Sequence, residues 1–70
     1  MKSLCLDPLK VTVCLARQKM TRSELCKRTG ISEGNMSVIM NRRTVRPKTA
    51  GVIADALKVD VTEIIALQNI

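Results

Sequence analysis

Apolar residues recur every three or four positions over most of the chain, a spacing that is typical of helices with one buried face. Asp7 followed by Pro8 predicts where the first helix begins, because the aspartate can cap free backbone N–H groups and proline is well tolerated at the first helical position. This helix is expected to end near Gln18, and residues 1–6 are expected to form a short leader. Its inner face consists of Val11, Cys14 and Leu15, with Gln18 in the last turn.

A capping box predicts the start of a second, short helix. The Thr21 hydroxyl can cap a backbone N–H, and the Glu24 side chain can reach back to the Thr21 amide. This helix is expected to end near Thr29, because Gly30 adopts the left-handed conformation of a helix terminus at little cost.

A third helix is expected over about Glu33–Arg42, after Ser32 as its cap. Two short helices joined by a tight turn with a glycine form the helix-turn-helix unit, here over residues 21–42. In this unit the second helix stands out as a ridge that fits the major groove of DNA. The side chains expected to lock the two helices together are Leu25, Ile31, Met36 and Ile39, with Met40 also at core spacing.

The rest of the chain predicts a basic loop and two more helices. The loop covers Arg43–Pro47, and a fourth helix covers about Lys48–Leu57. Its inward side chains are expected to be Val52, Ile53, Ala56 and Leu57. A capping box over Asp60–Glu63 predicts a fifth helix, which would contain Ile64, Ile65 and Leu67. The fold class is therefore all-α, with five short helices in a single domain over residues 1–70.

Positive charge is concentrated in the middle of the chain. The 12 basic and 6 acidic residues give a formal charge of +6. Between Arg17 and Lys48 lie nine bases and two acids, so this segment alone carries +7. A basic centre with nearly neutral flanks is typical of a surface that binds phosphate, although a generally soluble basic surface has the same charge.

The composition gives no indication of catalysis. The chain has no histidine, no paired carboxylates at a recognisable spacing and no glycine-rich phosphate loop, so an enzyme is not expected. Three cysteines without zinc spacing indicate core residues of a reduced, cytoplasmic protein. No uncharged stretch is long enough to cross a membrane. We expect no cofactor, no metal and no small-molecule ligand.

Several short motifs occur in a fixed order from Leu15 to Leu67. They are Met20-Thr21-Arg22-Ser23-Glu24-Leu25-Cys26, Gly30-Ile31-Ser32, Met36, Ile39, Ile53-Ala54-Asp55-Ala56-Leu57-Lys58-Val59 and Glu63-Ile64. In this order and spacing they resemble the Cro/CI-type (XRE family) helix-turn-helix domain, the lambda-repressor-like fold. Thr44-Val45-Arg46-Pro47 resembles the phosphate-binding loop of phage repressors in this family.

The chain departs from the family pattern at a few positions. Arg22 stands where the family often has a glutamine that touches phosphate or supports a recognition side chain. Cys26 replaces a small alanine, and Arg42 replaces the usual glycine after the recognition helix. Leu15 and Met40 occupy the positions of an arginine and a glutamate that are paired in some members. Because both charged residues of the pair are replaced by apolar ones, no charge is left buried without its partner.

The resemblance implies which residues contact double-stranded DNA in its major groove. Asn35 is expected to read adenine, and Glu33 either to accept from a cytosine amino group or to stabilise the helix N-terminus. The base-reading set is Glu33, Gly34, Asn35, Ser37 and Val38, with Val38 offering apolar contact to a thymine methyl. The phosphate contacts are Thr21, Arg22, Asn41, Arg43, Arg46 and Lys48, where Asn41 could instead cap the helix.

Two functions remain open. The first is a transcriptional repressor that acts by occupying its operator as a homodimer, with half-sites roughly 34 Å apart. Ile65 and Ile70 are expected to make the dimer contact. The alternative is a protein-interaction module on the same fold, such as an antitoxin or adaptor, with weak or non-specific DNA binding.

Overall fold

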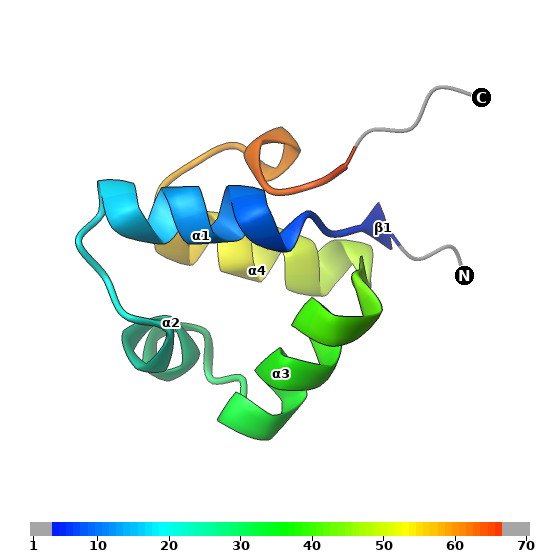
Figure 1. Cartoon of the computed structure of the whole chain (residues 1–70), viewed down its shortest axis with the longest axis horizontal. Coiled ribbons are helices and arrows are strands. Elements are labelled where there is room, and N and C mark those ends of the chain that lie inside the picture. The colour runs from blue at the N-terminus through cyan, green and yellow to red at the C-terminus, as the bar shows by residue number, and fades with distance from the viewer. Residues whose placement is uncertain (1–3, 67–70) are drawn as a thin grey trace.

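The computed structural model describes residues 4–66, which form four α-helices, a 3₁₀ turn and a two-stranded sheet (Figure 1). The elements in chain order are β1 Leu4–Cys5, α1 Pro8–Arg17, α2 Arg22–Thr29, α3 Glu33–Arg42, β2 Thr44–Val45, α4 Pro47–Leu57 and η1 Val61–Glu63. In the view of Figure 1, α2 and α3 lie below α1 and α4. The predicted all-helical fold class and the order of the first four helices are confirmed.

The sequence signals for the helix ends are also confirmed. The Asp7 carboxylate accepts hydrogen bonds from the N–H groups of Leu9 and Lys10 at the start of α1. Thr21 and Glu24 form both bonds of the capping box at α2. Gly30 ends α2 with φ of 76°, a conformation that glycine adopts without the steric cost of a side chain.

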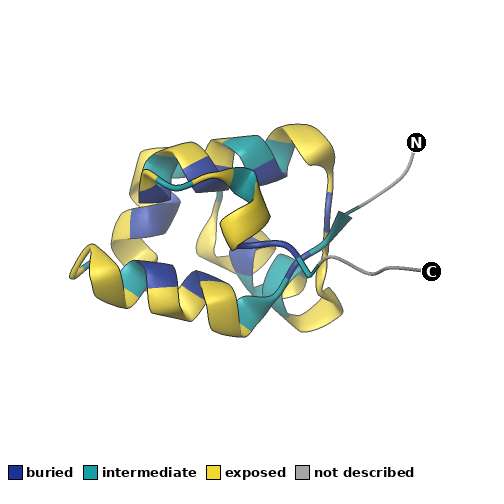
Figure 2. Cartoon of the chain, turned by 90° about the horizontal axis from the view of Figure 1, so that it is seen from above, coloured by how far each residue is buried: buried dark blue, intermediate teal, exposed yellow. Residues whose placement is uncertain are grey.

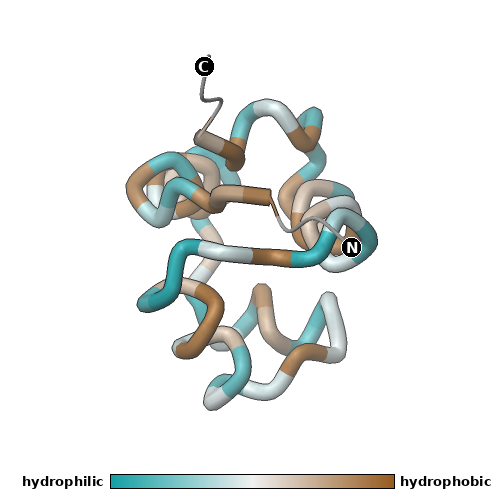
Figure 3. The backbone as a smooth tube through the Cα atoms, turned by 90° about the vertical axis from the view of Figure 1, so that its right-hand side faces the viewer, coloured by the Kyte–Doolittle hydropathy of each residue, from teal (hydrophilic) through white to brown (hydrophobic). Residues whose placement is uncertain are grey.

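The core is made only of aliphatic side chains, methionine and cysteine. Its buried residues are Leu6, Val11, Cys14, Leu25, Cys26, Met36, Val45, Ala50, Ile53, Ala54, Leu57, Ile64 and Ile65. They lie on the inner sides of the helices, with exposed residues outside (Figure 2). Hydrophobic and hydrophilic residues alternate along the whole path of the chain instead of collecting in one segment (Figure 3). All three cysteines are free. Cys14 and Cys26 are core residues, as expected, whereas Cys5 is only partly buried.

The inner face of α4 differs from the prediction. Ile53 and Leu57 are buried as expected, but Ala56 is only partly buried, and Ala50 and Ala54 are also part of the buried face. Val52 is exposed to 38% of its maximum, whereas Ala50, Ile53, Ala54 and Leu57 are buried. These four residues follow the spacing of one helix face. Val52 lies about 150° around the helix from the centre of that face, so it points to nearly the opposite side.

The predicted fifth helix is wrong. The Asp60 side chain caps a turn, but this turn is the short 3₁₀ element η1. The chain is extended beyond it, because Ile64 and Ala66 form backbone hydrogen bonds with the N-terminal segment. Ile65 is only 5% exposed, so its predicted role as an external dimer contact is also wrong. Leu67 and Ile70 lie outside the described residues.

Residues 4–6, which were predicted to belong to a leader, are part of the fold. Leu4 and Cys5 pair antiparallel with Val45 and Thr44, and Leu6 is 1% exposed in the core. The segment predicted as a loop after α3 therefore contains strand β2. Sequence periodicity could not show this pairing, because each strand has two residues and the partners lie about 40 positions apart.

Lys58 offers a test of the backbone geometry. It ends α4 with φ of 57°, a left-handed conformation that costs most residues about 1–2 kcal/mol. We expect Lys58→Gly to be more stable than Lys58→Ala by about 1 kcal/mol, the reverse of the order inside a helix. Urea unfolding of the two variants, neither of which has the lysine charge, measures this difference. Equal stability, or a more stable alanine variant, would contradict the left-handed geometry.

Candidate nucleic-acid interface

The turn between α2 and α3 is held by one threonine and one glycine. The Thr29 hydroxyl donates to the Leu25 carbonyl at 2.9 Å and accepts from the Ile31 N–H at 3.3 Å. Gly30 reverses the chain, and Ser32 caps α3 by accepting from the Asn35 N–H. The orientation of α3 relative to α2 is therefore fixed by local hydrogen bonds as well as by packing.

The predicted locking residues lie between the helices. Leu25 and Met36 are fully buried, and Ile31 and Ile39 are partly buried against the same core. Met40 and Leu15, which replace a charged pair of the family, also pack against this core. No described buried side-chain polar atom lacks a hydrogen-bond partner, so this interface has no unsatisfied charge.

The side chains predicted to read bases lie on the outer surface of α3. Glu33, Gly34, Asn35 and Val38 are exposed, and Ser37 is half-buried. The 48% exposure of Val38 is unusual for a valine and leaves an apolar contact available on the ridge.

One flank of α3 is tied to the start of α2. The Arg22 guanidinium donates to the Ser37 hydroxyl oxygen at 2.8 Å, and the Ser23 hydroxyl donates to the Glu33 carboxylate at 3.2 Å. Arg22 thus lies against the helix whose residues it was predicted to support. Ser37 and Glu33 already have a protein partner, whereas Asn35 has no side-chain bond within the described residues.

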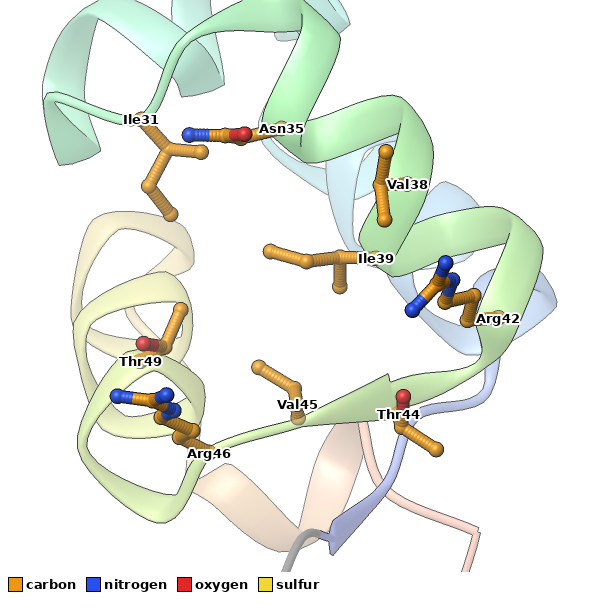
Figure 4. A pocket seen from close by; sticks show the side chains of 9 residues that line it. All are labelled: Ile31, Asn35, Val38, Ile39, Arg42, Thr44, Val45, Arg46 and Thr49. Carbon is orange, nitrogen blue, oxygen red and sulfur yellow. The ribbon is translucent and has the colours of Figure 1, made fainter.

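The other flank of α3 opens into a hollow (Figure 4). Asn35, Val38 and Arg42 line it from α3, Thr49 lines it from α4, and Arg46 lines it from the position just before α4. Its remaining lining residues are Ile31, Ile39, Thr44 and Val45. Partly or fully buried aliphatic side chains form its floor, and two guanidinium groups stand at its rim.

Arg42 was missed as a site residue. It follows Asn35 by seven positions and Val38 by four, so all three share one side of α3. This spacing is visible in the sequence, although many family members have a glycine at the position of Arg42. Arg42 is in fact the last residue of α3, and the left-handed residue that ends the helix is Arg43, with φ of 57°.

The predicted phosphate contacts form two groups on either side of the exposed part of α3. Thr21 and Arg22 lie at the start of α2. Arg43, Arg46 and Lys48 lie around β2 and the start of α4. All five are exposed, although the Thr21 hydroxyl is engaged in its capping box. Asn41 is exposed in the last turn of α3 and does not cap it, since Arg43 is the cap.

The positive charge of this surface is not neutralised by the protein. Within residues 4–66 the one ion pair joins Arg17 and Glu63, at 3.6 Å between exposed side chains. The arginines and the lysine near α3 therefore have no carboxylate partner in this part of the chain. A surface with uncompensated cations attracts polyanions and releases their counterions on binding.

No group of three potential metal ligands occurs in the described part of the chain. No helix there is long and apolar enough to cross a membrane.

The hydrogen bond between Arg22 and Ser37 generates a prediction. If Ser37 holds Arg22 where it meets a phosphate, Arg22→Ala and Ser37→Ala each weaken binding to duplex DNA. In the Arg22→Ala variant, the further substitution Ser37→Ala then causes little additional loss of binding free energy. The coupling energy between the two residues is expected to be about 0.5–1 kcal/mol. Fluorescence anisotropy with a labelled duplex measures the four dissociation constants. Lys27→Ala, on an exposed position of α2, is the matched control, and full additivity of the two losses would contradict the coupling.

The comparisons with known proteins agree with this geometry. Residues 10–69 match the family described as the Cro/C1-type HTH DNA-binding domain. No curated protein matches the chain in sequence. Its fold is similar to part of the solved structure of a mutant hydroxyethylphosphonate dioxygenase, with a TM-score of 0.77 and 20% identity. That match covers 94% of this chain and 14% of the dioxygenase chain, and at this identity it concerns the fold alone. The chain belongs to the Cro/C1-type family of helix-turn-helix DNA-binding domains.

Proposed function

We propose that this protein is a sequence-specific transcriptional repressor that acts by occupying an operator in double-stranded DNA. The observation that carries the proposal is the exposed ridge of α3, which lies between Arg22 on one side and Arg43, Arg46 and Lys48 on the other. No carboxylate in the described chain forms an ion pair with these cations. A helix of this width fits the major groove, and flanking cations fix its depth and register on the duplex.

The division of α3 into two flanks suggests how the sequence is read. Asn35 and Val38 face the open hollow and are free to meet base edges, Asn35 with paired hydrogen bonds to adenine and Val38 with a thymine methyl. Glu33 and Ser37 contribute from positions fixed by α2. Gly34 lets the helix approach the groove closely. We assign Thr21, Arg22, Asn41, Arg43, Arg46 and Lys48 to phosphates, and we add Arg42 to this set.

We further propose that the repressor binds as a homodimer to a two-fold operator. One recognition helix reads only a few base pairs, so a second copy would supply the affinity and specificity that a regulator needs. Because Ile65 is buried, it does not make the contact between the copies. The other residue that the sequence suggested, Ile70, lies outside the described residues.

A protein-interaction module is the second candidate, and one observation favours it. Leu9 and Val13 are 71% and 47% exposed one turn apart on α1, next to a hollow that also includes Arg17 and Thr62. Exposed aliphatic side chains at this spacing are suited to a partner protein. A protein-interaction module does not explain the cations around α3, and for that reason we rank it after the repressor.

Selection from a randomised duplex library at physiological salt tests the two functions. The purified protein should retain duplexes with a two-fold motif and a fixed distance between its halves. Salt-sensitive binding to bulk DNA without enrichment of any sequence would contradict the repressor and favour the interaction module.

The assigned roles predict different effects for two substitutions. Asn35→Ala should relax the preference at one or two base positions and leave the salt dependence of binding nearly unchanged. Arg46→Ala should weaken binding to every duplex alike and lower the slope of log K against log salt by about one. Titrations of both variants with selected and scrambled duplexes at several salt concentrations measure this. Identical behaviour of the two variants would show that the division into base readers and phosphate contacts is wrong.

A further inference from the structure

The N-terminal residues 4–7 run between two segments that are distant in sequence. On one side, the Leu6 N–H donates to the Arg43 carbonyl at 2.9 Å, and β1 pairs with β2. On the other side, the Ala66 N–H donates to the Cys5 carbonyl at 2.8 Å, and the Asp7 N–H donates to the Ile64 carbonyl at 2.9 Å. The backbone groups of successive residues thus point to opposite sides, as in the central strand of a sheet.

The segment held on the first side is the one that carries the phosphate-binding cations. Thr44 and Val45 pair directly with β1, and Arg43 and Arg46 flank these two residues. Arg43 keeps a left-handed conformation without being glycine, and its carbonyl is the acceptor of the Leu6 bond. A strained residue persists only where its surroundings determine its conformation, and β1 supplies part of those surroundings.

We propose that the N-terminal strand positions the phosphate-binding loop of residues 43–48. This inference rests on the proposed DNA-binding function, and it gives the N-terminus a role that the family match, which begins at residue 10, does not include. The strand lies on the side of the loop opposite to α3. It therefore positions the loop without itself being placed in the groove.

The physical reason is preorganisation. A loop of a few residues between α3 and α4 has several backbone conformations, and binding would have to select one of them at an entropic cost. Because the loop pairs with β1 and is anchored by the buried Leu6 and Val45, it adopts one backbone conformation when the protein folds. The guanidinium groups of the loop are then held at a fixed distance from α3 before any phosphate arrives.

A substitution at Leu4 separates this role from general stability. Leu4 is half-buried and pairs with Val45, and its N–H points to the same side as that of Leu6. Leu4→Pro removes this donor, whereas Leu4→Val keeps it and serves as the matched control. Each variant is prepared with and without Arg46→Ala. Binding to a plain mixed-sequence duplex is measured from about 50 to 200 mM salt, the range over which such binding changes steeply.

The expected result is a loss of coupling. In the Leu4→Val background, Arg46→Ala should lower the salt slope by about one. In the Leu4→Pro background the slope should already be lower, and Arg46→Ala should change it little. An equal effect of Arg46→Ala in both backgrounds would overturn the proposal, because a strand that only stabilises the fold changes the amount of active protein and not the slope.

Two further measurements keep the outcome decisive. Circular dichroism checks that each variant is helical. If Leu4→Pro is unfolded, Leu4→Gly replaces it in the same comparison with and without Arg46→Ala, because glycine loosens the strand and retains the N–H. If no variant binds DNA, the proposed function fails. Amide hydrogen exchange at Val45 would still decide whether the strand orders the loop, since Leu4→Pro should accelerate it at least tenfold and an unchanged rate would overturn the proposal.

Discussion

The arrangement of the DNA-binding surface depends on the chain reversal at Gly30. Because Gly30 has a φ of 76°, only three residues separate the end of α2 from the start of α3. The Thr29 hydroxyl forms hydrogen bonds with the Leu25 carbonyl and the Ile31 N–H at this turn. Because α2 also packs against α4, this turn determines how α3 stands relative to the rest of the core. The ties from Arg22 and Ser23 to α3 form only because the two helix starts meet at this angle.

The recognition helix has different surroundings on its two flanks. On the α2 side, polar residues are paired with one another, so their positions are set by the protein. On the side of the hollow, Asn35, Val38 and Arg42 have few neighbours and face a floor of aliphatic side chains. A rigid flank beside an open one gives a surface whose register is fixed while some of its side chains can still adjust to a ligand.

Local signals in the sequence predicted the parts of the structure that depend on local interactions. The caps at Asp7, Thr21 and Ser32 and the reversal at Gly30 involve neighbours within four positions, and all are as predicted. The pairing of β1 with β2 and the extended chain after η1 depend on contacts between the two ends and the middle, which periodicity does not encode. The error at Ile65 has the same origin, since its burial results from the bridge to Leu6.

The candidate site follows the same division. Its exposed positions on α3 could be predicted from the helix boundaries and the resemblance. The partners of Glu33 and Ser37 could not, because they come from the preceding helix through the angle of the turn.

Apart from Gly30, the left-handed residues within residues 4–66 are all cations. Lys19 follows α1, and Arg43 and Lys58 end α3 and α4, so each strained backbone position places a positive charge near the carbonyl end of a helix. Attraction to the helix dipole there offsets part of the steric cost, but dissolved ions screen it. The stability of the fold and the binding of DNA by its surface therefore both decrease when dissolved ions screen these charges. A cell that raises its internal ionic strength would loosen the protein itself at the same time as its hold on a polyanion.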